Sequence, residues 1–138
     1  MSVRVIAGSA KGRRLSVPRG GRVRPTADRA RETLFNVVTR RIPGCRFLDV
    51  FAGSGAVGIE ALSRGAVAST FIEQDPAALD VLRGNLEICG LSDEASVVAN
   101  NWQTGLRRLG ESGITFDLVF FDPPYDWEDA DRCLVKVA

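Results

Sequence analysis

The sequence predicts an α/β fold in which helices cover both faces of a Rossmann-like, doubly wound parallel sheet. Four short segments that are mostly apolar on both faces recur every 22 to 26 residues, which is typical of buried parallel strands joined by helices. They cover residues 47–52, 69–74, 95–100 and 117–122. Such a sheet binds its ligand at the carboxyl ends of the strands. We therefore expect the functional residues to follow these segments.

A basic segment precedes the sheet, and we expect it to form a β-hairpin. Two runs with alternating apolar residues, 3–8 and 13–18, are joined by Ser-Ala-Lys-Gly. The alternation would place the basic side chains on one face of the hairpin. We divide the chain into this arm, residues 1–24, and a sheet domain, residues 25–138.

A first helix is predicted to begin after Pro25, with Thr26 as its N-cap, and to end at Pro43-Gly44. Its expected apolar stripe consists of Ala30, Leu34, Val37 and Val38.

A second helix is predicted over residues 76–90, with Asp75 as its N-cap and Gly90 as its C-terminal stop. Its expected buried stripe consists of Ala78, Leu79, Leu82, Leu86 and Cys89.

The last predicted strand is strongly apolar, yet a single helix-like segment, residues 127–138, follows it. The strand would lie at or near a sheet edge, where unpaired backbone groups invite aggregation. We therefore expect a C-terminally truncated piece of a larger domain, from which the last strands are missing.

The net charge of +1 conceals a segregation of sign. Residues 1–41 contain eleven Lys or Arg and two acidic residues, whereas the remainder contains seven basic and fifteen acidic residues. A basic arm on an acidic body favours a polyanionic partner such as nucleic acid. Codon preference would explain why Arg outnumbers Lys, but it does not explain the segregation.

Composition excludes several classes of protein. The chain contains no histidine, which excludes histidine-based metal sites and general bases. Its three cysteines follow no motif spacing, so we expect free thiols in a reducing cytoplasm. No apolar run reaches the roughly 18 residues of a membrane span. We expect a cytoplasmic monomer without a metal ion or a membrane partner.

A glycine-rich segment, Gly53-x-Gly55-x-x-Gly58, follows the first predicted strand. It formally matches the dinucleotide-binding fingerprint. Glu73 ends the next strand, twenty residues after Gly53, where it could accept hydrogen bonds from ribose hydroxyls. Both a nicotinamide dinucleotide and S-adenosylmethionine would use such a residue.

Asp49 distinguishes between these two cofactors. No Lys or Arg lies between Asp49 and Arg64, and a carboxylate would repel a phosphate by roughly 4 kcal/mol at 4 Å and an effective dielectric of 20. The α-ammonium and sulfonium of S-adenosylmethionine are cations, which a carboxylate favours. The alternative is that Asp49 only caps a turn or a helix.

A second motif, Asp122-Pro123-Pro124-Tyr125, ends the fourth predicted strand. The prolines force the chain out of the strand and fix the Pro123 carbonyl. The Asp122 carboxylate and that carbonyl could both accept hydrogen bonds from one exocyclic amine, while Tyr125 stacks on its planar base. Transfer of a methyl group to such an amine needs this arrangement. The alternative is an ordinary proline-rich turn.

The segments "DVFAGSG" and "DPPY" resemble two motifs of class I S-adenosylmethionine-dependent methyltransferases that modify amines. The segments "RVIAGSAKGRRL" and "RPTADRARETLFN" resemble the bacterial 16S ribosomal RNA guanine-N2 methyltransferases of the RsmD type. The resemblance covers the whole chain. It implies a seven-stranded sheet and methylation of one guanine in assembled, or nearly assembled, small ribosomal subunits.

The resemblance also implies roles for individual residues. Cofactor contacts would come from Asp49, Phe51, Gly53, Gly55, Glu73, Gln74, Asn101 and Trp102. Asn100 is the alternative to Asn101 for this cofactor contact. The catalytic amine site would be formed by Asp122, Pro123, Pro124 and Tyr125. RNA contacts would come from Arg4, Lys11, Arg13, Arg14, Arg24, Thr26, Arg29 and Arg31.

Two other functions stay open from the sequence. A DNA adenine-N6 methyltransferase would use the same four-residue amine site. A catalytically silent RNA-binding assembly factor would keep the arm without the reaction. The destination of a methyl label separates all three.

Overall fold

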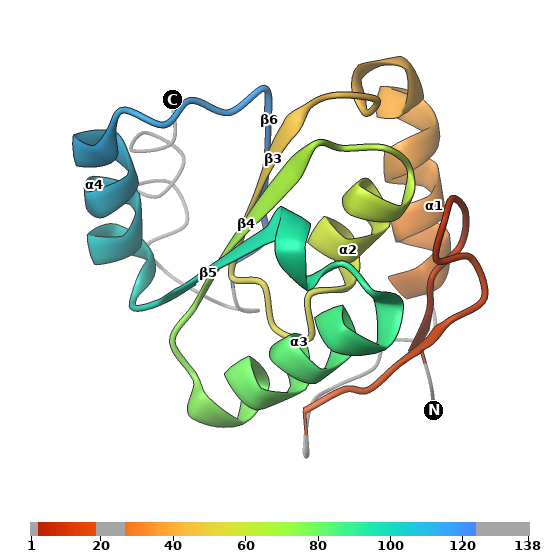
Figure 1. Ribbon diagram of the computed structural model, residues 1–138, viewed down its shortest axis with the longest axis horizontal. Coiled ribbons are helices and arrows are strands. Elements are labelled where there is room, and N and C mark those ends of the chain that lie inside the picture. Colours follow the sequence, from red (N-terminus) through yellow and green to blue (C-terminus); the bar gives the residue numbers. More distant parts are fainter. Residues whose placement is uncertain (1–2, 19–26, 124–138) are drawn as a thin grey trace.

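The computed structural model describes residues 3–18 and 27–123, and it contains a four-stranded parallel sheet (Figure 1). The strand order is β5-β4-β3-β6, formed by β3 (Arg46–Val50), β4 (Ala68–Glu73), β5 (Ala95–Ala99) and β6 (Leu118–Phe121). The four strands lie within one or two residues of their predicted bounds. Because the chain order reverses between β3 and β6, these two strands form the switch point at which a doubly wound sheet binds ligands.

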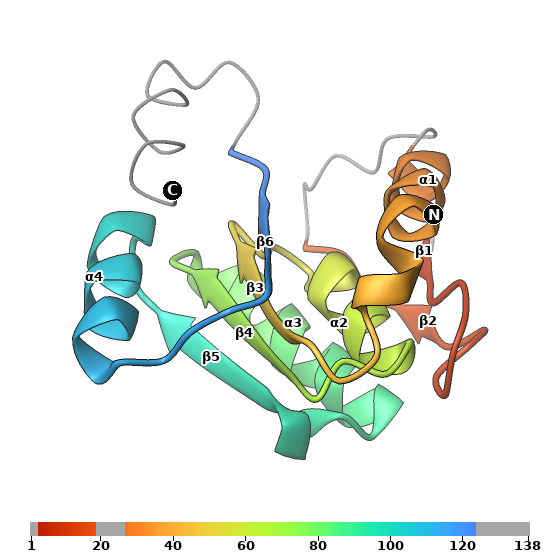
Figure 2. The ribbon, with the colours of Figure 1, turned by 90° about the horizontal axis from the view of Figure 1, so that it is seen from above.

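Helices cover both faces of the sheet, as predicted (Figure 2). One side carries α1 (Ala27–Val38), α2 (Ala56–Ser63) and α3 (Pro76–Cys89), and the other carries α4 (Trp102–Ser112). Two short 3-10 turns, η1 (Thr39–Arg41) and η2 (Ser92–Glu94), complete the connections. Alternate residues of β3 enter different cores: Phe47 packs in the cluster with α1, α2 and α3, and Leu48 in the cluster with α4.

The predicted ends and buried stripe of α3 are confirmed. The Asp75 carboxylate accepts the Ala78 N–H at 3.1 Å, and Gly90 ends the helix in the left-handed conformation. Four of the five predicted stripe residues are buried, and Cys89 is half-buried.

The predicted apolar stripe of α1 is half right, because Leu34 and Val38 pack against the core and are half-buried. Ala30 is exposed and Val37 is 79% exposed, whereas Phe35 and Arg31 are buried. Phe35 stacks on Phe47 with ring centroids 6.2 Å apart, and its large ring gains more from burial than a valine does. The α-helix ends at Val38, and η1 extends the turn to Arg41. Thr26, the predicted N-cap, lies outside the described residues.

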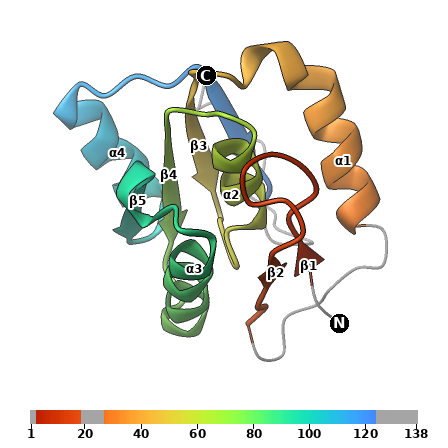
Figure 3. The same cartoon turned by 45° about the vertical axis from the view of Figure 1, so that its right-hand side comes forward.

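The arm forms the predicted hairpin, but its strands are much shorter than expected. Only β1 (Val3–Arg4) and β2 (Arg14–Leu15) pair, with Arg4 opposite Arg14. Val5 still bonds across the hairpin, to Gly12 and Arg13, whereas the N–H groups of Ile6, Ala7, Ser9 and Ala10 bond to Glu60 or Ser63 of α2. Figure 3 shows the arm crossing in front of α2 and running beside α3. The proposed boundary between arm and domain, at residue 24, falls outside the described residues.

The fourth predicted strand, β6, lies at the end of the described strand order, which agrees with the expectation of an edge position. None of its four residues is fully buried, whereas four of the five residues of the central strand β3 are. Among the described helices, none is both long and apolar enough to cross a membrane.

Candidate active site

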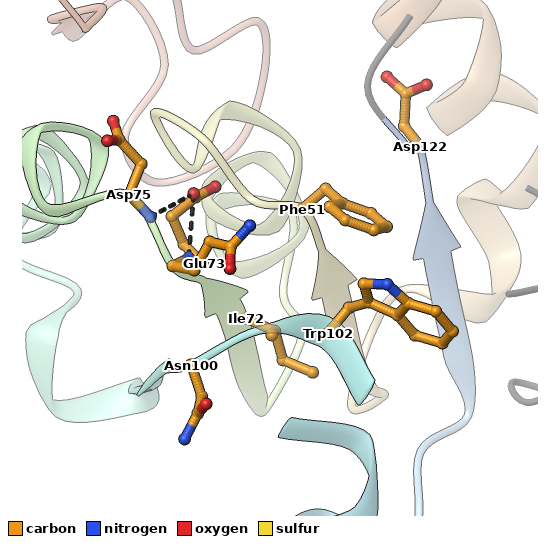
Figure 4. Close-up of a pocket in the computed structure, with 8 residues that line it drawn as sticks. Phe51, Ile72, Glu73, Asp75, Asn100, Trp102 and Asp122 are labelled. Atoms are coloured by element: carbon orange, nitrogen blue, oxygen red, sulfur yellow. Dashed lines mark hydrogen bonds between the residues drawn. The ribbon is translucent and has the colours of Figure 1, made fainter. Parts of the chain in front are cut away.

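A cavity of about 350 Å³ opens at the carboxyl ends of the sheet strands (Figure 4). It is lined by Phe51, Ile72, Glu73, Gln74, Asp75, Asn100, Trp102 and Asp122. These residues come from the ends of the four strands, from the turns that follow them and, for Trp102, from the start of α4. Five predicted site residues therefore meet in one cavity: Phe51, Glu73, Gln74, Trp102 and Asp122. Sequence reasoning placed the cavity correctly because parallel strands end at the same edge.

The glycine loop between β3 and α2 is held in an unusual conformation. Phe51 has a φ of 63°, which is uncommon for a large side chain. Gly55 has a φ of 84°, and a Cβ there would overlap the Leu82 side chain. Gly53 and Gly55, two predicted cofactor contacts, are not among the residues that line the cavity. Their visible role is to let the chain turn tightly into α2.

Glu73 joins this loop to the turn after β4. Its Oε1 accepts the Gly53 N–H at 2.7 Å. Its Oε2 accepts the N–H groups of Gln74 and Asp75 at 3.1 and 3.0 Å. Figure 4 shows the carboxylate at the end of β4, with the bonds to this turn as dashed lines. Because two carboxylate oxygens have about four acceptor positions, one position remains for a ligand hydroxyl.

Asp49 lies beneath the loop and not in the cavity, so the expectation of a carboxylate facing the cofactor is corrected. Its side chain is 1% exposed, and Oδ2 accepts the Gly58 N–H in the first turn of α2 at 3.0 Å. The pKa of Asp49 is raised to about 8, chiefly by burial; the Gly58 N–H opposes the shift, and the Asp122 and Glu73 charges add smaller contributions to it. Asp49 thus caps the start of α2, which was the alternative interpretation from the sequence.

Asn100, and not Asn101, lines the cavity. Asn101 is the N-cap of α4, because its Oδ1 accepts the Thr104 N–H at 2.8 Å. Asn100, the alternative considered for Asn101, is therefore the asparagine beside the cavity, and its contact with a cofactor stays a prediction. The sequence contained the signal, since an Asn three residues before Thr104 at a helix start is a typical cap.

Phe51 and Trp102 line the cavity and form an aromatic cluster with Phe121 of β6. Phe51 and Phe121 meet edge to face with centroids 5.3 Å apart, and Trp102 lies 6.4 and 6.2 Å from them. Sequence reasoning missed Ile72 and Asp75, which line the cavity, and Phe121, which packs against Phe51 and Trp102. Phe121 and Ile72 look like ordinary strand residues, and Asp75 was explained by its cap.

Asp122 is exposed, follows β6 directly and faces the cavity from the side opposite Glu73 (Figure 4). Pro123 is half-buried. The predicted partners Pro124 and Tyr125 lie outside the described residues.

The basic residues predicted to bind RNA fall into two groups. Arg4, Lys11, Arg13, Arg14 and Arg29 are exposed. Arg31 is 6% exposed; its guanidinium donates to the Arg4 carbonyl and has Nε 3.7 Å from Glu60. The burial of the side chain in this junction does not favour the predicted RNA contact of Arg31, which stays a prediction. Arg24 and Thr26 lie outside the described residues.

Comparison with known proteins gives consistent relatives. The chain is 40% identical over 132 residues to ribosomal RNA small subunit methyltransferase D of Haemophilus influenzae, covering 96% of the chain and 68% of the relative. It is 44% identical over 123 residues to the Escherichia coli protein of that name, covering 89% and 60%. A solved hypothetical protein from Thermus thermophilus matches with a TM-score of 0.86 and 38% identity, over 98% of this chain and 76% of that one.

The chain thus spans about 60 to 68% of the length of these two curated relatives. Residues 3–138 match the family described as "Conserved hypothetical protein 95". The resemblance recognised in the arm and in the glycine loop is confirmed. By this match and by its identity to both relatives, the chain belongs to the Conserved hypothetical protein 95 family of RsmD-type methyltransferases.

Proposed function

We propose that this chain holds the cofactor pocket and amine site of an enzyme that transfers a methyl group from S-adenosylmethionine to the 2-amino group of one guanine in 16S ribosomal RNA. The names of both relatives support small-subunit ribosomal RNA as the substrate. The observation that carries the proposal is the charge of the cavity. Its described lining includes three carboxylates, Glu73, Asp75 and Asp122, and neither Lys nor Arg.

The cavity fits S-adenosylmethionine in charge and in size. Three carboxylates favour the ammonium and sulfonium groups of this cofactor and oppose the pyrophosphate of a dinucleotide. A volume of about 350 Å³ lies within the usual range of small-molecule sites. Glu73 would accept a hydrogen bond from a ribose hydroxyl, and Phe51 and Trp102 would offer apolar surface to the adenine. When bound, the cofactor supplies the electrophilic methyl group.

Asp122 and Pro123 would position the nucleophile. The carboxylate and the carbonyl each accept one hydrogen of the guanine amine, which directs its nitrogen towards the methyl group. The carboxylate also stabilises the positive charge that develops on this nitrogen in the transition state. The amine proton leaves late, so no strong base is needed, which agrees with a chain that has no histidine. Pro124 and Tyr125 of the same motif would complete the face for the base.

The arm would bind RNA phosphates through its exposed basic residues, Arg4, Lys11, Arg13 and Arg14. Arg29, near the start of α1, is exposed as well and would extend this surface. The partner would be the small ribosomal subunit or a late assembly intermediate, in the cytoplasm, with the enzyme acting as a monomer.

Labelling tests the proposal directly. The full-length protein is incubated with methyl-labelled S-adenosylmethionine and, in parallel, with small subunits from cells that lack it, with protein-free 16S ribosomal RNA, and with DNA. We expect label in small-subunit RNA, recovered as N2-methylguanine by mass spectrometry of the nucleosides. Label in DNA adenine would establish the DNA methyltransferase instead. Cofactor binding without label in any nucleic acid would establish the silent assembly factor.

A further inference from the structure

Asn85 is a fully buried polar side chain in the middle of α3, with 0% exposure. Its Oδ1 accepts the Ser16 N–H at 2.8 Å, and its Nδ2 donates to the Ser16 carbonyl at 3.0 Å. The second N–H of the same amide donates to the Ser54 carbonyl at 2.9 Å. Both amide hydrogens are therefore used, and the two carbonyl partners fix which way the amide points.

These two partners belong to different functional regions. Ser16 directly follows β2 of the arm, and Ser54 lies inside the glycine loop between β3 and α2. The loop continues into the cavity, because the preceding residue, Gly53, donates its N–H to Glu73. A single side chain thus connects the arm to the loop that holds the candidate ribose-binding carboxylate. Asparagine is a poor helix former, so α3 gains nothing locally from this residue.

The arm is also anchored at a second place that does not touch the loop. Ser63 Oγ accepts the Ala10 N–H at 2.9 Å and donates to the Ala7 carbonyl at 2.6 Å. Within the described part of the chain, the hydrogen bonds of the Ser63 side chain reach the arm alone, whereas those of Asn85 reach both the arm and the loop. Asn85 and Ser63 therefore form a matched pair for substitution. Substituting either one removes two hydrogen bonds to the arm, but only substitution of Asn85 also removes the hydrogen bond to the glycine loop.

We propose that Asn85 is a positioning residue that couples RNA binding on the arm to cofactor binding in the cavity. The inference rests on the proposed function of these two regions. RNA that immobilises the arm fixes Ser16, and through Asn85 it holds the Ser54 carbonyl and the glycine loop in the binding conformation. The cofactor then binds a loop that is already ordered, and by linkage the cofactor strengthens RNA binding by the same factor.

The test is the ratio of two dissociation constants of S-adenosylhomocysteine, the non-reactive product, measured by equilibrium dialysis without and with saturating small ribosomal subunits. Subunits alone serve as the blank. For the parent protein we expect binding to tighten about 5-fold or more when subunits are present, at the lower end of typical couplings. Asn85→Leu, which has similar volume and none of the three bonds, should bring the ratio close to one. Ser63→Ala should weaken RNA binding and keep the parental ratio.

A merely structural role for Asn85 would lower stability or both affinities and would leave the ratio unchanged. The inference is overturned by a parental ratio of one, by an unchanged ratio in Asn85→Leu, or by an equal loss in Ser63→Ala. If the parent protein binds neither subunits nor S-adenosylhomocysteine, the proposed function fails, and this inference fails with it.

A measurement on the parent protein alone covers the case in which Asn85→Leu does not fold. Hydrogen exchange of residues 53–58 is followed without cofactor, before and after addition of small subunits. We expect exchange to slow in this segment, although it lies outside the proposed RNA surface. Unchanged exchange there, with protection confined to the arm, would overturn the coupling.

Discussion

Two glutamates, Glu60 and Glu73, accept backbone N–H groups from neighbouring loops. They differ in whether a positively charged side chain neutralises the carboxylate. Glu60 on α2 is fully buried, and its carboxylate is shared by two N–H groups and two guanidinium groups. These come from Ile6 at 2.8 Å, Ala7 at 3.0 Å, Arg64 at 2.8 Å and Arg31 at 3.7 Å. Its charge is neutralised inside the protein, so Glu60 serves the junction between arm and domain.

Glu73 at the end of β4 accepts three N–H groups but makes no ion pair with any described residue. It is half-buried and faces the cavity. A carboxylate that is fixed by backbone donors and has no counter-charge among the residues that the structure describes would suit a ligand. Glu60 and Glu73 thus accept similar backbone N–H groups, although one carboxylate is structural and the other is proposed to bind a ligand. The difference between them is that guanidinium groups pair with Glu60.

The largest effect should come from Glu60→Ala. It removes the carboxylate that two guanidinium groups face in a buried junction, so we expect the free energy of unfolding to fall by about 3–5 kcal/mol. Urea denaturation measures it. Glu73→Ala is the control and should lose less than half as much. Equal losses at both positions would end the distinction between the two carboxylates.

Asp122→Ala should act on the reaction and not on folding. We expect the rate of methyl transfer in a single turnover to fall by roughly 10²-fold or more, the range for loss of one transition-state contact. Dissociation constants of cofactor and RNA should stay within a few-fold of the parental values. Near-parental turnover would remove the amine site from Asp122.

Glu73→Ala should weaken binding of S-adenosylmethionine by roughly 1.5–3 kcal/mol, the usual loss for a hydrogen bond to a charged group. Calorimetric titration measures this loss, and RNA affinity should hardly change. If the cofactor binds as before, Glu73 does not hold the ribose, and the contrast with Glu60 loses its functional meaning.

Asp49 gives the comparison a third carboxylate, which is buried without a cation. Burial raises its pKa to about 8 in the folded protein, against the ordinary value of 3.8 in the unfolded chain. Between these values the folded state keeps a proton that the unfolded state has lost. The free energy of unfolding should therefore fall by about 1.4 kcal/mol per pH unit as the pH rises through this window.

Asp49→Asn should remove that slope, because the amide stays neutral at every pH and can still accept the Gly58 N–H. Denaturant midpoints of parent and variant between about pH 5 and pH 8 measure the difference. Parallel curves for the two proteins would show that Asp49 titrates normally.

The smallest effect concerns the outer surface of the arm. If the arm neutralises about five phosphates, the logarithm of RNA affinity should fall with the logarithm of salt concentration with a slope of about −4. Replacing both Arg13 and Arg14 by Ala should flatten this slope by about one to two units. Cofactor affinity should not change. An identical slope would mean that these exposed side chains point away from the RNA.

The parts of the molecule that the sequence predicted are those set by short-range patterns. Strand bounds followed from apolar runs, and α3 followed from Asp75 and Gly90. The cavity followed from the rule that parallel strands end together, which brought Glu73 and Asp122 to one place although they are far apart in the chain.

The rest depended on long-range partners that no local pattern reveals. Glu60 and Asn85 read as ordinary polar helix residues, yet both are buried because the arm packs over them. Arg31 reads as one more basic surface residue, and its burial follows from the carboxylate on α2. Asp49 was the residue whose charge favoured S-adenosylmethionine over a dinucleotide. It lies below the glycine loop and does not face the cavity. The cofactor prediction nonetheless fits the structure, because other carboxylates line the cavity.

The close contact of Gly8 with α2 has a consequence for the order in which the protein can fold. A Cβ at Gly8 would overlap the Ser63 carbonyl, so the arm fits its seat in one way only. The seat consists of residues 53 to 69 positions further along the chain. During synthesis the arm leaves the ribosome before these residues exist. Its docking closes a long loop and must wait for α2 and α3. Within this chain, the basic arm is thus made before the helices that hold it in place.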